Sequence, residues 1–312
     1  MDSVSLFISL VLQGLAVGAI MALWTLGLSI IWGTSRIINI AHGEFILIGA
    51  YVTLICHNIF VQTCSNSCLP SSMSWFYTIE PFIYLPVAGF VVALIGSVIQ
   101  YLLYNKVVGK EPIISLILGF GVSIILSGLL VVFFSGDTRF ITTPAILNSI
   151  SLFGYSIQTG QAIAAVLSLV IFVATYLYME KTDNGRAIRA VSQDKDAALL
   201  MGVNDTKIFF IAMFLSGFIA GAAGNVVAAL YPFSPSVGGT YLGWSFVISV
   251  LAGLGTIQGV FIAGLIIGFV RNMTTFFSPD FGITGIEPAV GFIVMIAVII
   301  VRPLGLFGRR SE

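Results

Sequence analysis

Residues 6–33, LFISLVLQGLAVGAIMALWTLGLSIIWG, contain no charged side chain. A helix needs roughly 20 apolar residues to cross the hydrocarbon core of a bilayer, and this run is long enough. A signal peptide would show a basic residue before a short apolar core and a small-residue cleavage site after it, and neither is present. The stretch therefore predicts a retained membrane-spanning helix.

The rest of the chain repeats this pattern. Six further runs have the length of a span, and two more are shorter: 40–60, 83–104, 112–134, 160–179, 208–230 and 257–276, then 242–254 and 287–301. Hydrophobic residues make up 58% of the 312 positions and charged residues 8%, whereas soluble domains have about 25% charged residues. We expect an all-α polytopic membrane protein with about eight to nine transmembrane segments, forming a single transmembrane domain over residues 1–312. The net charge of zero argues against a nucleic-acid partner.

The short run 242–254 is flanked by the glycine-rich stretches GGTYLG and GLGTIQG. A broken or re-entrant segment is compatible with this pattern, because irregular backbone is tolerated at membrane depth where protein or water surrounds it. A thin crossing helix is the alternative, and the sequence does not separate the two.

The basic residues predict the orientation. If the N-terminus lies outside, eleven Lys and Arg residues fall on the cytoplasmic side and only Arg139 and Arg271 fall outside. Cytoplasmic loops carry the excess of Lys and Arg. We therefore expect a periplasmic N-terminus and a cytoplasmic C-terminus.

The longest cytoplasmic loop, 181–207, is unusually polar. Ten of the 26 charged residues lie between Glu180 and Lys207. We expect Ser192 to cap a short exposed helix with Asp194 and Asp196 in its first turn, and Gly202 to end it. The helix would carry Ala197, Ala198 and Leu199, followed by Leu200 and Met201. Taken alone, an ordinary solvated connection between two spans is the commoner explanation.

Small residues recur every fourth position in several runs. The sets are Gly14, Gly18 and Ala22; Gly89, Ala93 and Ser97; Ser115, Gly119, Ser123 and Ser127; Gly217 and Gly221; and Gly255, Gly259 and Ala263. Such faces let helix backbones approach closely in lipid, so they predict a tightly packed bundle.

The sequence carries no recognisable enzyme or metal motif. No GxSxG turn or phosphate loop is present, and His42 and His57 are not spaced like metal ligands. Cys64 and Cys68 lie in an outward loop, where a local disulfide and two free thiols are equally compatible with the sequence. The spans 83–104, 112–134, 160–179 and 208–230 hold no central ionisable residue, although ion-coupled carriers usually need one. The energy source is therefore expected in another chain.

Several stretches together resemble one transporter family. INIAHGEFILIGAYV at 38–52, GRAIRAVSQDKDAALLMGVND at 185–205, VLAGLGTIQGVFIAGLIIG at 250–268 and VRPLGLFGR at 301–309 are similar, in order, to the smaller membrane subunit of the branched-chain amino acid ABC importers. The resemblance extends over nearly the whole chain. It implies a type II importer permease fold in the bacterial inner membrane, and a conduit for branched-chain or other hydrophobic and neutral amino acids.

The resemblance also implies partners and sites. The partners are a second permease subunit, two ATPase subunits that bind ATP and Mg, and a periplasmic substrate-binding protein, so no cofactor is expected in this chain. The ATPase-coupling residues would be Ser192, Asp196, Ala197, Ala198, Leu199 and Gly202. Asn39, His42, Gly43 and Glu44 are candidates for the translocation path, although helix capping and packing explain them equally well.

Two alternatives remain open from the sequence. Urea and short-amide importers share the same patterns, so the substrate is not fixed. A stand-alone secondary carrier is the second alternative, in which the loop 181–207 would be only a connection.

Overall fold

The computed structural model describes residues 3–63, 80–142, 148–152, 155–283 and 285–308. The α-helices within these ranges are α1 (Ser3–Ser35), α2 (His42–Thr63), α4 (Leu85–Leu102), α5 (Pro112–Phe134), α7 (Thr159–Lys181), α8 (Asp183–Gln193), α9 (Lys195–Leu200), α10 (Asp205–Leu230), α11 (Gly238–Ala252), α12 (Ile257–Phe277) and α13 (Glu287–Val301). Three short 3-10 helices are η2 (Tyr104–Lys106), η3 (Pro235–Val237) and η4 (Ser278–Phe281).

The long apolar runs all form helices. Seven helices in the described part of the chain are long and apolar enough to cross a membrane, and each overlaps one of the seven long predicted runs. The two short runs form α11 and α13, of 15 residues each. The predicted all-α membrane architecture with about eight to nine segments is confirmed.

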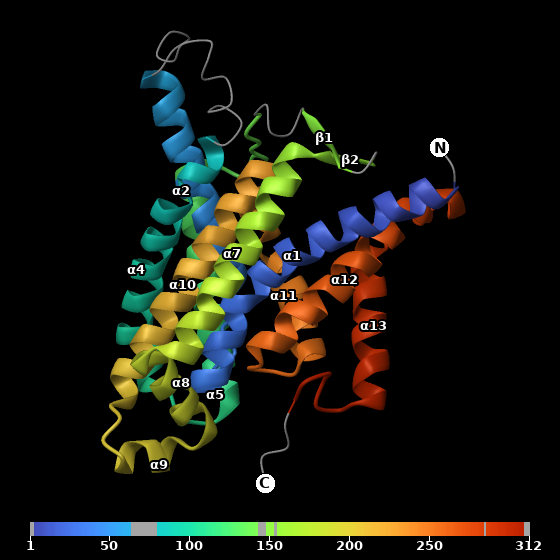
Figure 1. Ribbon diagram of the computed structural model, residues 1–312. Coiled ribbons are helices and arrows are strands. Elements are labelled where there is room, and N and C mark those ends of the chain that lie inside the picture. Colours follow the sequence, from blue (N-terminus) through green and yellow to red (C-terminus); the bar gives the residue numbers. More distant parts are fainter. Residues whose placement is uncertain (1–2, 64–79, 143–147, 153–154, 284, 309–312) are drawn as a thin grey trace.

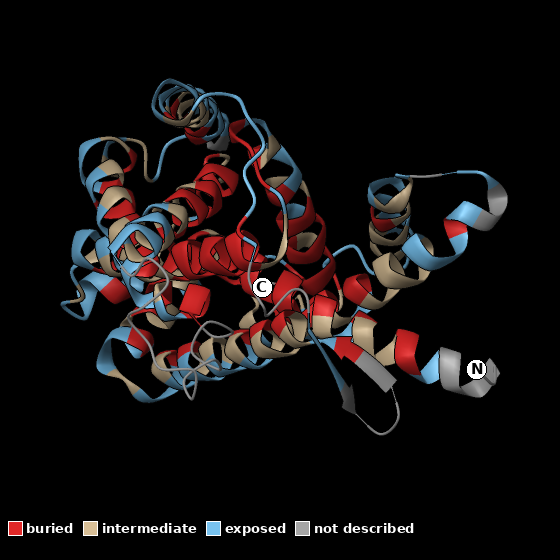
Figure 2. Cartoon of the chain, turned by 90° about the horizontal axis from the view of Figure 1, so that it is seen from above, coloured by how far each residue is buried: buried red, intermediate tan, exposed pale blue. Residues whose placement is uncertain are grey.

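Helix α10 lies at the centre of the bundle, packed against α1, α2 and α4, while α1 runs diagonally beside α12 (Figure 1). Buried residues gather where these helices meet, and exposed residues occupy the outward faces of the surrounding helices (Figure 2). Much of the exposed surface is apolar, including Ile117 and Val132 of α5 and Ile300 of α13. Such an outer surface suits lipid or a partner chain rather than water.

The predicted small-residue faces make close helix contacts. A β-carbon added at Gly221 would lie 2.4 Å from the carbonyl oxygen of Ala88 on α4, and one at Gly18 would lie 2.7 Å from the Cα of Leu265 on α12. Because lipid gives helices no hydrophobic reason to associate, packing of this kind stabilises the bundle. The α5 face differs from the prediction, because it meets irregular chain: Gly119 packs on the backbone of Ile38.

The two ends of the bundle are unlike. A two-stranded antiparallel hairpin, β1 (Ser149–Leu152) and β2 (Tyr155–Gln158), pairs Ser149 with Gln158 at one end, which we call the hairpin end. Helices α8 and α9 lie at the other, the α9 end (Figure 1). Helix α1 begins towards the hairpin end, whereas residues 304–308 lie towards the α9 end, as an odd number of crossings requires.

Candidate functional site

The second crossing is broken near the middle of the bundle. Helix α1 ends at Ser35, and residues 36–41 return towards the interior without forming a helix. His42, the first residue of α2, donates a hydrogen bond from Nε2 to the carbonyl oxygen of Trp24 over 2.7 Å. Trp24 precedes Ser35 by eleven residues, which is about 16 Å along a helix. Helix α2 therefore begins deep inside the bundle and not at its α9 end.

The crossing that contains the short predicted run is broken as well. After α10 ends, Phe233 exchanges backbone hydrogen bonds with Arg139, which follows the last residues of α5. The chain then passes through η3, and α11 begins at Gly238. Helix α11 ends close to the α9 end, where Gly255 packs on Gly33 of α1. The sequence left two alternatives for 242–254, a broken segment and a thin crossing helix. The structure agrees with the first, because an irregular stretch and η3 precede helix α11 in this crossing.

The two breaks meet each other. A β-carbon at Gly43 would lie 2.0 Å from the carbonyl oxygen of Gly238, and one at Gly238 would lie 2.8 Å from the carboxylate atoms of Glu44. The starts of α2 and α11 therefore touch around the Glu44 side chain. Both helix starts carry the positive end of a helix dipole, which favours a carboxylate.

Glu44 is buried but incompletely paired. Oε1 accepts a hydrogen bond from Ser123 Oγ of α5 at 2.9 Å, whereas the buried Oε2 has no hydrogen-bond partner. Only 6% of the residue is exposed. A buried polar atom without a partner is costly and needs an explanation such as a transient ligand or water. Glu44 is thus the polar group at the junction of α2, α5 and α11.

The other three predicted path residues point elsewhere. The Asn39 side chain accepts a hydrogen bond from Tyr104 Oη at 3.0 Å instead of capping α2. His42 is fully buried against α1, and Gly43 provides the close approach to α11. Ser123 was predicted only as part of a small-residue face, because nothing in the sequence connects it to Glu44.

The side chain of Arg271 reaches further into the bundle than its place in the sequence indicates. Its neighbours Phe269 and Asn272 pack on Gly14, so its backbone lies near the beginning of α1, towards the hairpin end. Its Nη1, however, is 3.9 Å from Sδ of Met21, near the middle of α1. Arg271 is an ionisable residue within a candidate span whose guanidinium points inwards.

The polar loop contains two capped helices, α8 and α9, where one was predicted, and the capped start of α10 follows them. Thr182 caps α8, Asp194 caps α9 and Asn204 caps α10, each accepting a hydrogen bond from a backbone N–H at 3.0 Å. The prediction that Ser192 is the cap is wrong, since Ser192 belongs to the last turn of α8. Asp194 replaces it because its extended backbone separates the two helices and directs its carboxylate at Ala197 N–H.

Helix α9 ends as predicted. Gly202 has φ +82°, and its N–H bonds to Leu199 O while Val203 N–H bonds to Ala198 O. This pair of bonds is the Schellman termination, which requires a left-handed residue. A salt bridge from Lys195 to Asp205, at 3.0 Å, ties the start of α9 to α10.

The faces of α9 are sharply divided. Ala198 is 5% exposed and packs into the chain's own core with Val191 and Ile208. Leu200 and Met201 are 89% and 84% exposed, and Asp196 and Ala197 are also on the surface. Exposed apolar side chains on an otherwise polar loop form a surface suited to a partner. Leu199, which is 41% exposed, adjoins these two, and we call Leu199, Leu200 and Met201 together the α9 tip.

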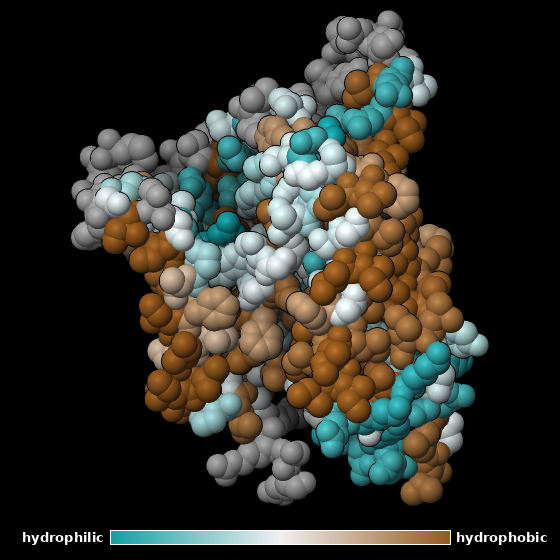
Figure 3. Space-filling model, turned by 180° about the vertical axis from the view of Figure 1, so that it is seen from behind, coloured by the Kyte–Doolittle hydropathy of each residue, from teal (hydrophilic) through white to brown (hydrophobic). Residues whose placement is uncertain are grey.

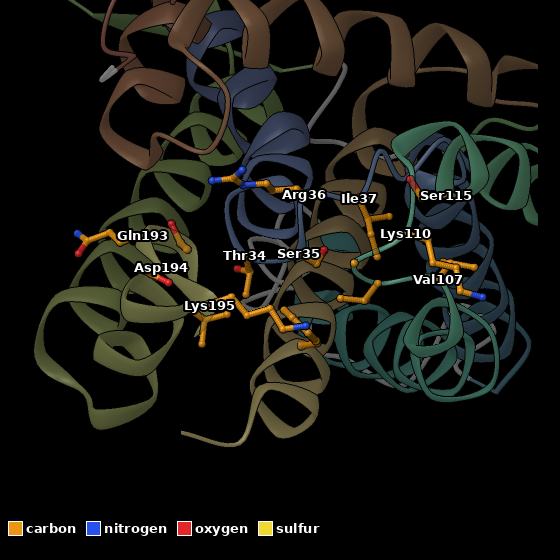
Figure 4. Close-up of a pocket in the computed structure, with 15 residues that line it drawn as sticks. Thr34, Ser35, Arg36, Ile37, Val107, Lys110, Ser115, Gln193, Asp194 and Lys195 are labelled. Carbon is orange, nitrogen blue, oxygen red and sulfur yellow. The ribbon is translucent and has the colours of Figure 1, made fainter. Parts of the chain in front are cut away.

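A cavity of about 400 Å³ lies between this loop and the first break (Figure 4). Its lining comes from the end of α1 with Ile37, the α4–α5 connection, the α8–α9 junction and Phe209 of α10. Arg36, Lys110 and Lys195 contribute positive charge to it. The cavity separates the α8–α9 junction from the chain that leads to Glu44.

The possible disulfide predicted from the sequence falls on residues that the structure does not describe. Cys64 and Cys68 are outside the described residues, and Cys56 is a free thiol in α2. No group of three or more His, Cys, Asp or Glu residues that could hold a metal occurs among the residues that the structure describes.

Seven long apolar helices and two broken crossings that meet at mid-depth define a polytopic membrane transport protein. Residues 10–302 match the family model for the branched-chain amino acid transport system, permease component, and the chain belongs to this family. It is 28% identical to the high-affinity branched-chain amino acid transport system permease protein LivH of Salmonella typhimurium, and 28% identical to BraD of Pseudomonas aeruginosa. Each alignment covers 97% of this chain and 96% of the relative. A probable LivH of Methanocaldococcus jannaschii is 26% identical over 93% of this chain and 89% of its own length. No solved structure matches the chain significantly.

Proposed function

We propose that this chain is the permease subunit of a binding-protein-dependent ABC importer for branched-chain or other hydrophobic and neutral amino acids. The observation that carries the proposal is the match to LivH and BraD over 97% of the chain. A second permease subunit, two ATPase subunits and a periplasmic binding protein complete the importer. The chain lies in a bacterial inner membrane, with the hairpin end in the periplasm and the α9 end in the cytoplasm.

The path runs along the face where the two broken crossings meet. Small and polar residues form a pale band between two apolar flanks on the back of the molecule (Figure 3). Gly239 and Thr240 of α11 are exposed on this helix. Ser123 of α5 and Glu44 of α2 are hydrogen-bonded to each other beside the start of α11. Broken helices place substrate sites near the membrane midplane in many transporters, which supports this location.

Coupling to ATP hydrolysis enters at the α9 tip. The tip is apolar and exposed, and its helix is fixed by the Asp194 cap, the left-handed Gly202 and the Lys195–Asp205 salt bridge. Rigid presentation of apolar side chains allows a partner's movement to be transmitted. Ala198 supports α9 from within, because its methyl group faces the chain's own core.

The test is co-purification of the ATPase with the Leu200→Asp variant, together with amino acid uptake in proteoliposomes. Leu200 is 89% exposed, so the substitution leaves this chain's own packing intact. It places a charge in an apolar contact, and we expect loss of the ATPase and at least about tenfold slower uptake. Thr206→Asp adds the same charge in the exposed first turn of α10. This control variant should retain the ATPase and should take up amino acids at the wild-type rate. Normal uptake and ATPase retention in Leu200→Asp would refute the coupling role.

The same preparation separates this proposal from a stand-alone carrier. Uptake by the wild-type complex should require both ATP and the binding protein. Uptake by the isolated chain driven by an ion gradient would refute the importer assignment.

A further inference from the structure

An arginine without an ion-pair partner lies in the middle of the transport protein. Arg271 projects from α12 towards α1 and α11, and its guanidinium carbon lies 5.4 Å from the centre of the Trp244 ring. No ion pair to a carboxylate is found for Arg271 among the residues whose side chains are described. A charge at this depth is expensive, and such residues mark substrate or ion pathways by default.

The surroundings of this charge are aromatic. Trp24 packs edge-on against Tyr241 at 5.1 Å and against Tyr231 at 6.2 Å, measured between ring centres. Tyr241 lies three residues before Trp244 on α11, so the two side chains share one face of that helix. One cation among apolar ring faces complements an aliphatic molecule that carries a single anionic group.

The hydrogen-bonding capacity of the guanidinium is largely unused in the described contacts. A guanidinium has five N–H donors, and the side-chain acceptor found for Arg271 is the weakly accepting sulfur of Met21. The residue is half-buried. On α11, the helix that carries Trp244, a β-carbon at Gly239 or Gly243 would meet nothing within 4 Å, so open space adjoins that helix.

We propose that Arg271 binds the α-carboxylate of the amino acid during its passage, with Trp244 holding the guanidinium in position. Planar guanidinium groups match carboxylates with two parallel hydrogen bonds, and a cation–π contact with a neighbouring ring restrains the position of the guanidinium. The inference rests on the proposed function and narrows it, because urea and simple amides carry no carboxylate. It also makes the chain itself a contributor to substrate selection.

The first measurement uses the tryptophan fluorescence of the full chain in detergent, since Trp244 contacts the guanidinium. The probes are leucine, 4-methylpentanoate, which keeps the carboxylate but lacks the amine, and leucinamide, which lacks the carboxylate. Leucine and 4-methylpentanoate should change the emission at millimolar concentration, and leucinamide should not. Arg271→Gln should abolish both responses, whereas Arg302→Gln, at an exposed arginine after α13, should retain them. An equal response to leucinamide, or a retained response in Arg271→Gln, would overturn the inference.

The second measurement is leucine uptake by the complete importer in proteoliposomes. Loss of a charge-assisted pair predicts a decrease of about tenfold to hundredfold for Arg271→Gln. Arg271→Lys keeps the positive charge but loses the planar guanidinium. Its uptake should therefore lie between that of Arg271→Gln and that of the wild type. Full uptake in an assembled Arg271→Gln complex refutes the carboxylate site and leaves the importer intact. Absent uptake in an assembled wild-type complex refutes the proposed function instead.

Discussion

Adding one methyl group at Gly238 tests whether the Glu44 junction operates in transport. In Gly238→Ala, the new β-carbon would lie 2.8 Å from Glu44 Cδ and Oε2 and 2.9 Å from Oε1. Ordinary van der Waals contact begins near 3.4 Å, so the carboxylate must retreat by about 0.6 Å, the difference from 2.8 Å. A glutamate side chain can move by that much without backbone change. The structure therefore predicts a displaced carboxylate in a normally folded protein.

The expected free-energy changes are small and of opposite sign. Losing the Ser123–Glu44 hydrogen bond costs about 1.5–3 kcal/mol at most, and replacing glycine by alanine in a helix returns up to about 1 kcal/mol. The free energy of unfolding should fall by about 0.5–2 kcal/mol by this arithmetic. We expect uptake to fall about tenfold, because a shift of well under one ångström at a working site is costly.

A glycine of α5 outside the proposed path supplies a control. A β-carbon at Gly121 would meet nothing within 4 Å, so Gly121→Ala should transport as the wild type does. Ser123→Ala removes the same hydrogen bond from the other side. If both changes act through that bond, Gly238→Ala combined with Ser123→Ala should be no worse than either alone.

The assays are amino acid uptake by the reconstituted importer and the thermal unfolding midpoint of each purified variant. Uptake unchanged in Gly238→Ala would refute a role for the Glu44 junction. Fully additive losses in the double variant would show that the two residues act independently, contrary to the geometry.

Three further predictions concern orientation, capping and packing. In a variant without native cysteines, a cysteine at exposed Gln193 should react with an impermeant thiol reagent only from the cytoplasm, and one at exposed Thr138 only from the periplasm; the reverse labelling would invert the proposed topology. Asp194→Ala should cost about 1 kcal/mol of local helix stability and reduce ATPase co-purification, whereas Ser192→Ala should not, and equal effects would contradict the assignment of the cap. Gly224→Val should prevent a stable bundle because its β-carbon would lie 2.0 Å from Ile46 O, while Gly128→Val has open space; equal thermal stability of the two in detergent would count against the packing.

Hydropathy and charge predict this fold well because lipid imposes strict rules. Every backbone group in a span must be paired internally, so a long apolar run becomes a helix with few alternatives. For this reason each of the seven long predicted runs overlaps an observed spanning helix, although residues 40 and 41 precede α2. The left-handed Gly202 was equally predictable, since few other residues adopt that conformation cheaply.

The cap of α9 shows where local reasoning fails. Ser192 and Asp194 are both good capping residues, and local propensity does not choose between them. The choice depends on how far α8 extends, and Val191, on its last turns, is buried in the core. Burial of α8 carries the helix past Ser192 to Gln193, which leaves Asp194 as the first free position. The same tertiary contact turns Ala198 inwards and the α9 tip outwards.

The mid-membrane residues could not be placed because hydropathy reports length and not depth. The predicted run 40–60 was counted from one surface to the other, but its helix begins beside Trp24, about 16 Å inside the bundle. For Arg271, hydropathy likewise does not show the direction of the side chain. Its position near the end of an apolar run suggests a surface location, and its backbone does lie near the beginning of α1, but its guanidinium reaches inwards to Met21. Two charges of opposite sign, Glu44 and Arg271, therefore lie inside a protein whose sequence suggests an almost uncharged interior. They contact different parts of α11, Glu44 at its start and Arg271 over Trp244 near its middle, six residues later. Six helical residues rise about 9 Å along the axis. The Glu44 junction and the proposed carboxylate site at Arg271 therefore face successive turns of one helix, which suits a conduit that must release its substrate.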